Sequence, residues 1–244
     1  MLKLGKQYRL NYKGEEVITE RKKEFQHWTQ TVENVPNAVD NNQISNRAVV
    51  IGNSAGRKEF NLNLLKTSSG LLGADTVQTY GCNALYRDFT PDFLIATGPE
   101  IVKEIATRPY VNENIVYSSA INLLGYPNKF YLIPYDPYAD AGTTAAYIAA
   151  FDGHKKIYLL GFDEQVTPNV NFNMYASTNG YNSLDETIDS TIWLQNRRQL
   201  YDVYNDVDFV WVTQYGRSTV PEIHKDCLNF RQISYRDFVL ECDL

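Results

Sequence analysis

The chain is poor in cysteine and in long apolar runs. Its three cysteines, Cys82, Cys227 and Cys242, are far apart and form no Cys-x-x-Cys pair, so we expect reduced, mostly buried thiols and no zinc site or other bound metal. No stretch reaches the roughly 18 to 20 apolar residues that span a bilayer, and the first residues lack the apolar core of a signal peptide. The sequence therefore predicts a cytoplasmic protein without a membrane span.

Positive charge is also in short supply. The chain has 23 Lys and Arg against 29 Asp and Glu, a formal net charge of -6, whereas affinity for nucleic acid comes largely from Lys and Arg that neutralise phosphates. We therefore expect no nucleic-acid partner. Neither Gly-x-Gly-x-x-Gly nor Gly-x4-Gly-Lys-Ser/Thr occurs, so the usual dinucleotide and triphosphate loops are missing as well.

From residue 46 onward, short apolar runs alternate with stretches of helical character. This alternation predicts an α/β fold with a mainly parallel, Rossmann-like open sheet flanked by helices. The expected strands lie within residues 47–52, 75–82, 91–97, 114–119, 129–134, 155–161 and 207–212, and the expected helices within 99–107, 141–153 and 184–205.

Residues 1–45 have a different character. Polar and apolar residues alternate over 6–12, Lys-Gly at 13–14 supplies a turn, and 15–19 returns as a second strand, which predicts a hairpin. The polar residues that follow show no sustained period. Because a lone hairpin is marginally stable in water, we expect an N-terminal arm, 1–45, that packs on the α/β domain, 46–244, or on a partner such as a second copy or a virion protein.

Small and amide-bearing residues stand where four of the expected strands end. In open α/β sheets ligands bind beyond the carboxyl ends of the strands. Asn and Asp side chains can form specific hydrogen bonds with a ribose or a base. Turn preferences alone also enrich these residues in α/β loops, so both interpretations stay open. The residues are Gly52, Asn53, Ser54, Asn83, Gly98 and the Gly161-Phe162-Asp163 run.

Three blocks of the sequence resemble one family. VVIGNSAGRKEF (49–60), TYGCNALYRDFTPDFLIATGPEIVKEI (79–105) and AGTTAAYIAAFDGHKKIYLLGFD (141–163) are similar in order and spacing to bacterial sialyltransferases that modify lipooligosaccharide. They are also similar to the broader group of sialyltransferase-like and motility-accessory glycosyltransferase domains. The resemblance covers about residues 48–163, and its third block is the most specific.

The resemblance implies a glycosyltransferase that takes a sugar from a CMP-linked donor by metal-independent direct displacement. It implies no cofactor beyond this nucleotide sugar, and a glycan or small molecule as acceptor. Asp163 would close the rim of the site, and Tyr175 resembles a tyrosine whose hydroxyl binds the leaving phosphate. The residues implied to contact the donor are Gly52, Asn53, Ser54, Asn83, Gly98, Gly142, Thr143 and Thr144.

The chain also departs from the family pattern. Ser54 and Ala55 replace a glycine and a proline of the first loop, Gly98 replaces an asparagine, and Ala141 replaces a serine. The general-base histidine of the family has no counterpart between residues 164 and 223. His224 is the only late histidine and becomes the candidate base, with Asp163, Glu164 and Asp185 as substitutes.

Other functions stay open. The altered loop, the missing histidine and the arm favour, as the alternative, a non-catalytic phage structural or accessory protein that keeps the fold and grips a partner through residues 1–45. A pterin pyrophosphokinase is a third possibility, but its magnesium needs carboxylates and none cluster near Gly52.

Four arginines could bind a carboxylate or phosphate group of a ligand, although each could instead form only a surface ion pair. They are Arg197, Arg198, Arg217 and Arg231.

Overall fold

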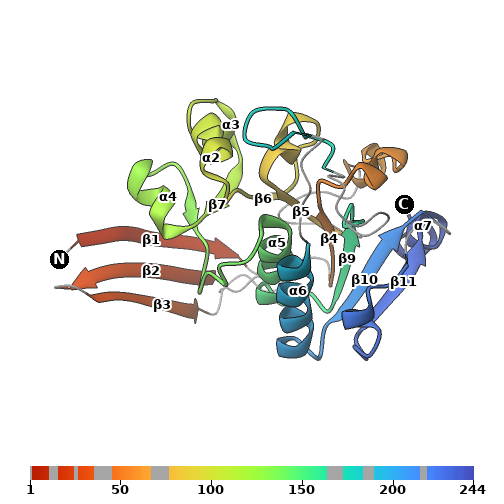
Figure 1. Ribbon diagram of the computed structural model, residues 1–244. Helices are drawn as coiled ribbons and strands as arrows, with labels where there is room; N and C mark the ends of the chain where they lie inside the picture. Colours follow the sequence, from red (N-terminus) through yellow and green to blue (C-terminus); the bar gives the residue numbers. More distant parts are fainter. Residues whose placement is uncertain are drawn as a thin grey trace.

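A computed structural model of the 244-residue chain gives the arrangement of its elements (Figure 1). It describes residues 46–66, 77–163, 173–183, 190–214 and 219–244, together with the backbone course of strands within 2–10, 16–24 and 27–35. The candidate residues Glu164, Asp185 and Arg217 lie outside the described residues.

Eight parallel strands form one open sheet, in the order β11-β10-β9-β4-β5-β6-β7-β8. The expected Rossmann-like parallel sheet is thus confirmed, and all seven expected strands belong to it. β11 was not expected from the sequence. The strands are β4 (Arg47–Ile51), β5 (Gln78–Cys82), β6 (Phe93–Ile95), β7 (Ile115–Ser118), β8 (Tyr131–Leu132), β9 (Lys156–Leu160), β10 (Asp208–Thr213) and β11 (Phe230–Ser234).

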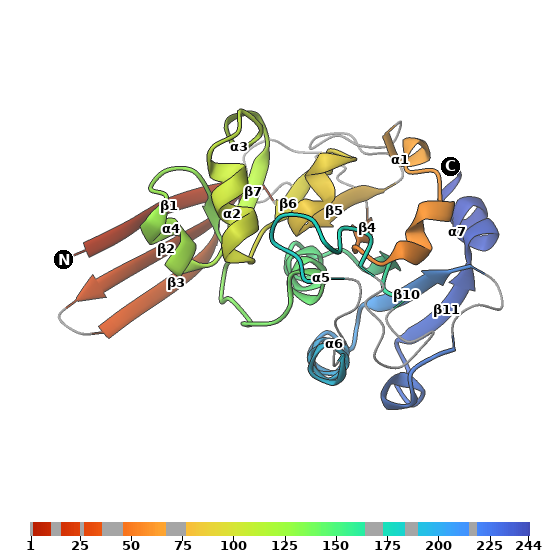
Figure 2. The same ribbon diagram turned by 45° about the horizontal axis from the view of Figure 1, so that its top comes forward.

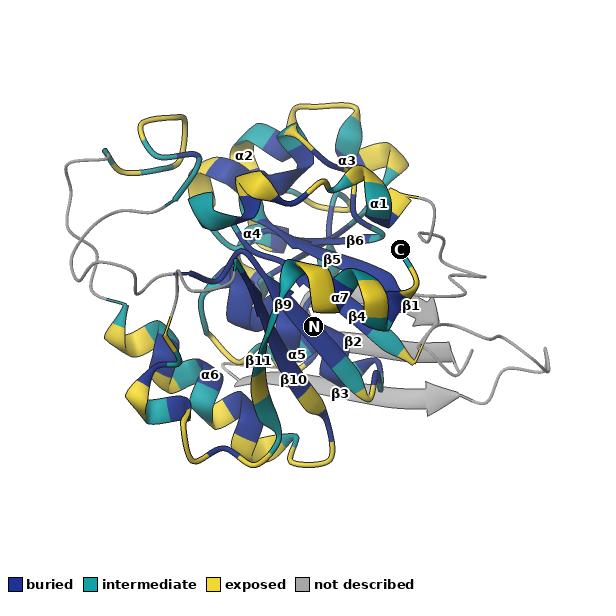
Figure 3. Ribbon diagram, turned by 90° about the vertical axis from the view of Figure 1, so that its right-hand side faces the viewer, coloured by how far each residue is buried: buried dark blue, intermediate teal, exposed yellow. Residues whose placement is uncertain are grey.

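Both faces of this sheet are covered, as the strand sequences require. Ala-Val-Val-Ile in β4 and Ile-Tyr-Leu-Leu in β9 are buried throughout, the pattern of a parallel strand between two layers. Val49 and Ile51 face one buried cluster, and Ala48 and Val50 face the other. Figure 3 shows the buried strands between these layers, with exposed residues on the outer sides of the helices.

The three expected helices are present as α2 (Pro99–Ala106), α5 (Ala141–Phe151) and α6 (Thr191–Val203). The first part of the third expected helix, 184–189, lies outside the described residues. α5 packs across β4 and β5 because its small residues, such as Ala145, Ala146 and Ala149, are fully buried there. α2 and α7 lie on the opposite face. The helices not expected are α1 (Asn63–Lys66), α3 (Tyr110–Glu113), α4 (Ala120–Gly125) and α7 (Tyr235–Cys242), with the 3-10 turns η1 (Ala55–Glu59), η2 (Asn83–Arg87) and η3 (Glu222–His224).

The strand order reverses between β4 and β9. From β4 the chain builds outward through β5, β6, β7 and β8, then returns through α5 and adds β9 on the other side of β4. This reversal is the topological switch point, where open α/β sheets bind their ligands beyond the carboxyl ends of the strands. The loops after β4 and β9 are therefore the first place to look for a site.

The N-terminal region forms a separate three-stranded antiparallel sheet, β1 (Leu2–Leu10), β2 (Glu16–Glu24) and β3 (His27–Val35). The expected hairpin corresponds to β1 and β2, and β3, which was not expected from the sequence, continues the sheet over 27–35. β1 contacts α4, and Figure 1 shows this sheet on the side of α4 and β7. In the described part of the chain, no helix has the length and apolar content to cross a bilayer.

Candidate functional site

A cavity of about 270 Å³ opens at the switch point. Its wall comes from the ends of β4, β5 and β9, the starts of α5 and α6, and the segment 173–183, which Figure 2 shows passing above α5. We call it the site cavity. Its lining residues are Gly52, Asn53, Ser54, Cys82, Asn83, Asp140, Ala141, Gly142, Gly161, Phe162, Asn173, Gly180, Tyr181, Asn182, Ser190 and Trp193.

Two glycines let the ends of β4 and β9 meet in the wall of this cavity. The amide of Gly52 donates to the carbonyl oxygen of Leu160 at 2.8 Å, and that of Ser54 donates to Gly161 at 3.0 Å. A Cβ on Gly52 would lie 2.3 Å from the oxygen of Gly161, which itself has a φ of +78°. The glycine at the end of β4 is thus required by backbone packing, whatever ligand the loop binds.

Asn53 follows this contact and presents an unused acceptor. Its Nδ2 donates to the carbonyl oxygen of Cys82 at 3.3 Å and to the Tyr181 hydroxyl at 3.0 Å. Because a carbonyl oxygen only accepts, the first contact fixes the orientation of the amide. The Oδ1 atom is buried and has no donor among the described residues, so a ligand N–H or O–H, or a water molecule, would satisfy it.

Asn83 has a strained backbone and joins two strand ends. Its φ of 46° lies in the left-handed region, which Asn tolerates better than most residues. Its Oδ1 accepts from the amides of Thr97 at 3.1 Å and Gly98 at 3.4 Å, so its Nδ2 remains to donate toward the cavity it lines. Gly98 does not line the cavity; its amide holds Asn83 in place.

The start of α5 contributes Gly142 but neither of the predicted threonines. A Cβ on Gly142 would lie 2.9 Å from the Phe162 ring, so any other residue there would force the ring to shift. The Thr143 hydroxyl donates to the carboxylate of Asp140 at 2.5 Å, and the Thr144 hydroxyl donates to the carbonyl of Ala139 at 3.3 Å. Both threonines are buried, and their hydroxyls form hydrogen bonds to residues at the start of the helix.

Asp163 turns away from the site cavity. Phe162 lines the cavity, but the next side chain is buried against η1, where a Cβ on Gly56 would come within 2.3 Å of the Asp163 Oδ2. The predicted rim residue therefore supports the loop after β4 from behind and does not line the cavity.

Tyr175 also lies outside the cavity lining, in a buried polar cluster. Its hydroxyl accepts from the Arg57 guanidinium at 2.7 Å and donates to Asp88 at 2.5 Å. Burial raises the pKa of Tyr175 above its ordinary value, although the charge of Arg57 opposes the rise. This tyrosine anchors the segment 173–183 to η1 and does not reach a ligand in the cavity.

His224, the predicted base, lies on the far side of α6. It is buried against Tyr201 and Phe230, and its Nε2 lies 3.0 Å from the carbonyl oxygen of Leu194. Because that oxygen only accepts, Nε2 carries a proton and donates it. Burial lowers the pKa of His224, and the residue does not line the site cavity.

The described arginines do not line the cavity either. Arg197 stacks its guanidinium on the Phe162 ring at 5.3 Å from behind. Arg198 bonds to Asp202 and Asp226, and Arg231 pairs with Glu241.

Several lining residues were not singled out from the sequence. The signal for Tyr181 was weak, because it stands six residues after Tyr175 and nothing in the pattern shows which of the two faces inward. Its hydroxyl accepts from Asn53 and from the amide of Ala84 at 3.2 Å. With two donors on the oxygen, the phenolic proton is free to point at a ligand. Burial raises the pKa of Tyr181, which keeps it a donor.

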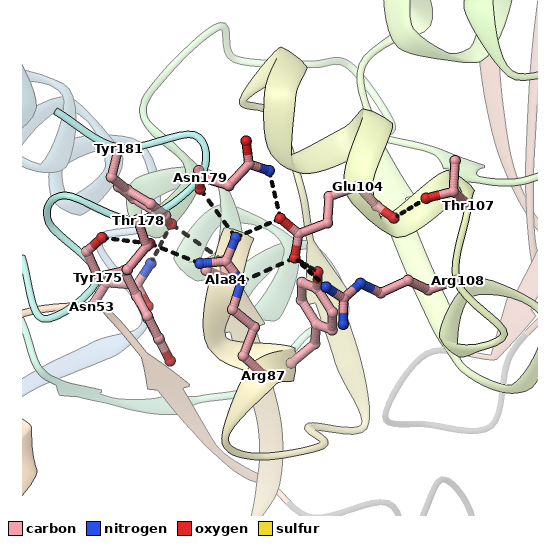
Figure 4. A network of polar contacts seen from close by, with 11 residues as sticks. Asn53, Ala84, Arg87, Glu104, Thr107, Arg108, Tyr175, Thr178, Asn179 and Tyr181 are labelled. Carbon is pink, nitrogen blue, oxygen red and sulfur yellow. Dashed lines mark hydrogen bonds and ion pairs between the residues drawn. The ribbon is translucent and has the colours of Figure 1, made fainter.

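A second clamp holds the segment 173–183 (Figure 4). Arg87 donates to the Thr178 hydroxyl at 2.8 Å and to the carbonyl oxygen of Asn179 at 3.0 Å. Glu104 pairs with Arg87 at 2.6 Å, accepts from the Asn179 side chain at 2.5 Å, and also accepts from Tyr86. We call these contacts the Arg87 clamp. It fixes the part of the wall that carries Gly180, Tyr181 and Asn182.

The cavity carries little charge. Asp140 is its one charged residue among the described lining residues. Helix N-termini carry a partial positive charge, and α5 and α6 both begin at the cavity wall. Within the described ranges, no three His, Cys, Asp or Glu side chains gather as metal ligands would. The lining therefore suits a ligand held by neutral amides, hydroxyls, aromatic rings and backbone donors.

Comparisons of this chain with protein-family models, with curated proteins and with solved structures found no match.

Proposed function

We propose that this chain is a metal-independent, sialyltransferase-like glycosyltransferase that binds a CMP-linked nucleotide sugar in the site cavity. The observation that carries the proposal is that residues from separate parts of the sequence line the same cavity. Gly52, Asn53 and Ser54, then Asn83, then Gly142 come from three separate sequence blocks that resemble the family, and all of them line one cavity at the switch point. The parallel sheet brings these strand ends to one edge, and the polar groups gathered there are the ones that we assign to the donor.

The amide groups suit the nucleoside half of the donor. Asn53 offers a buried acceptor without a donor among the described residues, and Asn83 offers a donor. A base or a ribose presents hydrogen-bond donors and acceptors side by side, so it can pair with both amides. A ligand that left a buried polar group unpaired would bind more weakly. The rings of Tyr181 and Trp193 add the aromatic surface on which a base or sugar stacks.

Backbone and hydroxyl donors suit the phosphate. Ala141 and Gly142 are the first residues of α5, so their backbone N–H groups have no acceptor within the helix. Both residues line the cavity. The Tyr181 hydroxyl has its proton free to donate. Such donors stabilise negative charge that develops on a departing nucleotide without a metal.

Calorimetric titration with CMP, CDP, UDP and their sugar conjugates tests the proposal. We expect CMP and a CMP-linked sugar to bind, and Asn53→Ala to weaken them about tenfold, because a buried hydrogen bond contributes about 1.5 kcal/mol. The matched control is Asn112→Ala, an exposed amide on α3, which should leave the affinity unchanged. No binding by any nucleotide at millimolar concentration would refute the proposal.

One observation favours a second function, that of a binding protein which works through its N-terminal sheet. β1 and β3 each pair with β2 only, so among the described strands both outer edges of this sheet are open. Unpaired edges are templates for another strand. The partner would be a second copy or, for a phage-encoded chain, a virion protein.

Deleting residues 1–45 tests this second function. We expect the oligomer mass measured by light scattering to fall, while the far-ultraviolet circular dichroism of the remaining domain stays that of an α/β protein. If the truncated chain forms an oligomer with the same number of subunits as the full-length chain, the arm is not the binding element. If the full-length chain is a monomer, its partner is not a second copy.

A further inference from the structure

The proposed transfer needs a proton acceptor inside the site cavity. An acceptor hydroxyl that attacks the anomeric carbon must lose its proton, and the group that takes it has to lie within hydrogen-bond reach. His224 donates to Leu194 behind α6, and Asp163 lies against Gly56. His154 is buried beside the Tyr80 hydroxyl, at the end of β9 opposite the cavity. None of the three lines the cavity.

Among the residues that the structure describes, Asp140 is the carboxylate that does line it. As the N-cap of α5, its Oδ1 accepts from the amide of Thr143 at 2.9 Å, and its Oδ2 accepts from the Thr143 hydroxyl at 2.5 Å. These bonds fix the carboxylate in one orientation. Each oxygen has a second lone pair, and Asp140 is only partly buried, so both the cavity and solvent have access to it.

We propose that Asp140 is the general base of the transfer, an assignment that rests on the proposed function. The acceptor oxygen forms a bond to the anomeric carbon of the donor sugar, and its proton passes to a carboxylate oxygen of Asp140. The bond between the anomeric carbon and the phosphate oxygen breaks, and its electron pair leaves with CMP. The same residue thus caps a helix and accepts the proton.

The substitution Asp140→Asn separates these two roles. Asparagine is as good an N-cap as aspartate, so it keeps an acceptor for the Thr143 amide but cannot accept a proton from an alcohol. We expect CMP to bind within about threefold of the wild-type affinity, whereas CMP release from a CMP-linked sugar falls about 10²- to 10⁴-fold. Sodium formate, a small carboxylate, should restore part of this rate, which a purely structural role would not allow.

The matched control is Asp136→Asn, four residues earlier. Asp136 accepts from the amide of Tyr138, so it also orders a loop, but it does not line the cavity. We expect its rate to stay within about twofold of wild type, without a response to formate. Water serves as the acceptor in this assay, so the natural acceptor need not be known.

The outcomes separate the two proposals. Wild-type protein that binds no nucleotide refutes the proposed function and, with it, this assignment. Wild-type protein that binds CMP but releases none from the CMP-linked sugar overturns the assignment alone. Full activity in Asp140→Asn, or a loss that comes with lost CMP binding and no formate rescue, overturns it as well.

Discussion

Gly52→Ala is expected to lower the free energy of unfolding by about 3 kcal/mol, toward the upper end of the range for overpacked sites. The new Cβ would lie 2.3 Å from the backbone oxygen of Gly161 and 3.1 Å from the Phe162 ring. Neither strand end can retreat easily, because hydrogen bonds from Gly52 and Ser54 join them on both sides of the contact. Urea denaturation followed by fluorescence measures the loss.

Gly125→Ala is the matched control for this substitution. Gly125 is the last residue of α4, and a Cβ there would meet nothing within 4 Å. Alanine has a higher helix propensity than glycine, so we expect a change between zero and about 1 kcal/mol in the stabilising direction. Equal denaturation midpoints for the two variants would contradict the packing argument.

Glu104→Gln is expected to lower the free energy of unfolding by roughly 2 to 3 kcal/mol at pH 7. It should also remove the part of the pH dependence of this free energy that comes from Glu104. Burial of Glu104 opposes ionisation, yet hydrogen bonds from Arg87, Tyr86 and Asn179 outweigh it and lower its pKa from 4.5 to about 2. Its side chain is only 11% exposed. A carboxyl whose pKa falls by this amount on folding contributes stability of that order.

The sign of the pH dependence follows from the direction of this shift. Between pH 4.5 and 2 the unfolded chain binds the proton and the folded chain does not, so the contribution is complete above about pH 5 and is lost as the pH falls toward 2. We expect urea midpoints of wild type and Glu104→Gln to differ at pH 7 and to converge near pH 2. A difference that stays constant over this range would be incompatible with the assignment.

The same variant should weaken ligand binding. Without the carboxylate, Arg87 loses the partner that directs it toward Thr178 and Asn179, and the wall that carries Tyr181 loosens. The affinity for CMP, the ligand that we propose, should fall about three- to tenfold. Glu113→Gln, an exposed carboxylate on α3, is the control for both the stability and the binding measurements.

The sequence predicted the centre of the fold better than its periphery. β4 and β9 are near-continuous apolar runs because two layers bury them, and such runs are visible without any structure. β11 is an edge strand whose Arg231 and Gln232 interrupt its apolar pattern. α3 and α4 are too short to establish a helical period.

The site was predictable to the extent that strand ends determine it. Gly52, Asn53 and Asn83 follow strands directly, and the shared edge of a parallel sheet brings them together. Tyr175 and Tyr181 stand in a segment without helix or strand, so no periodicity indicates which ring turns inward. Their orientations depend on Arg57, Arg87 and Asn53, which are distant in sequence.

The segment 173–183 owes its course to side chains that belong to other elements. Apart from the bridge between Ser54 and Asn173, it is held to the domain largely by Arg57 through Tyr175 and by the Arg87 clamp. Tyr181 adds to this support, because its hydroxyl accepts from Asn53 and from the amide of Ala84. A transplanted loop that keeps Asn173, Tyr175, Thr178 and Tyr181 would follow the same path while exchanging Asn182, which makes Asn182 the position at which ligand preference can change on an unchanged sheet.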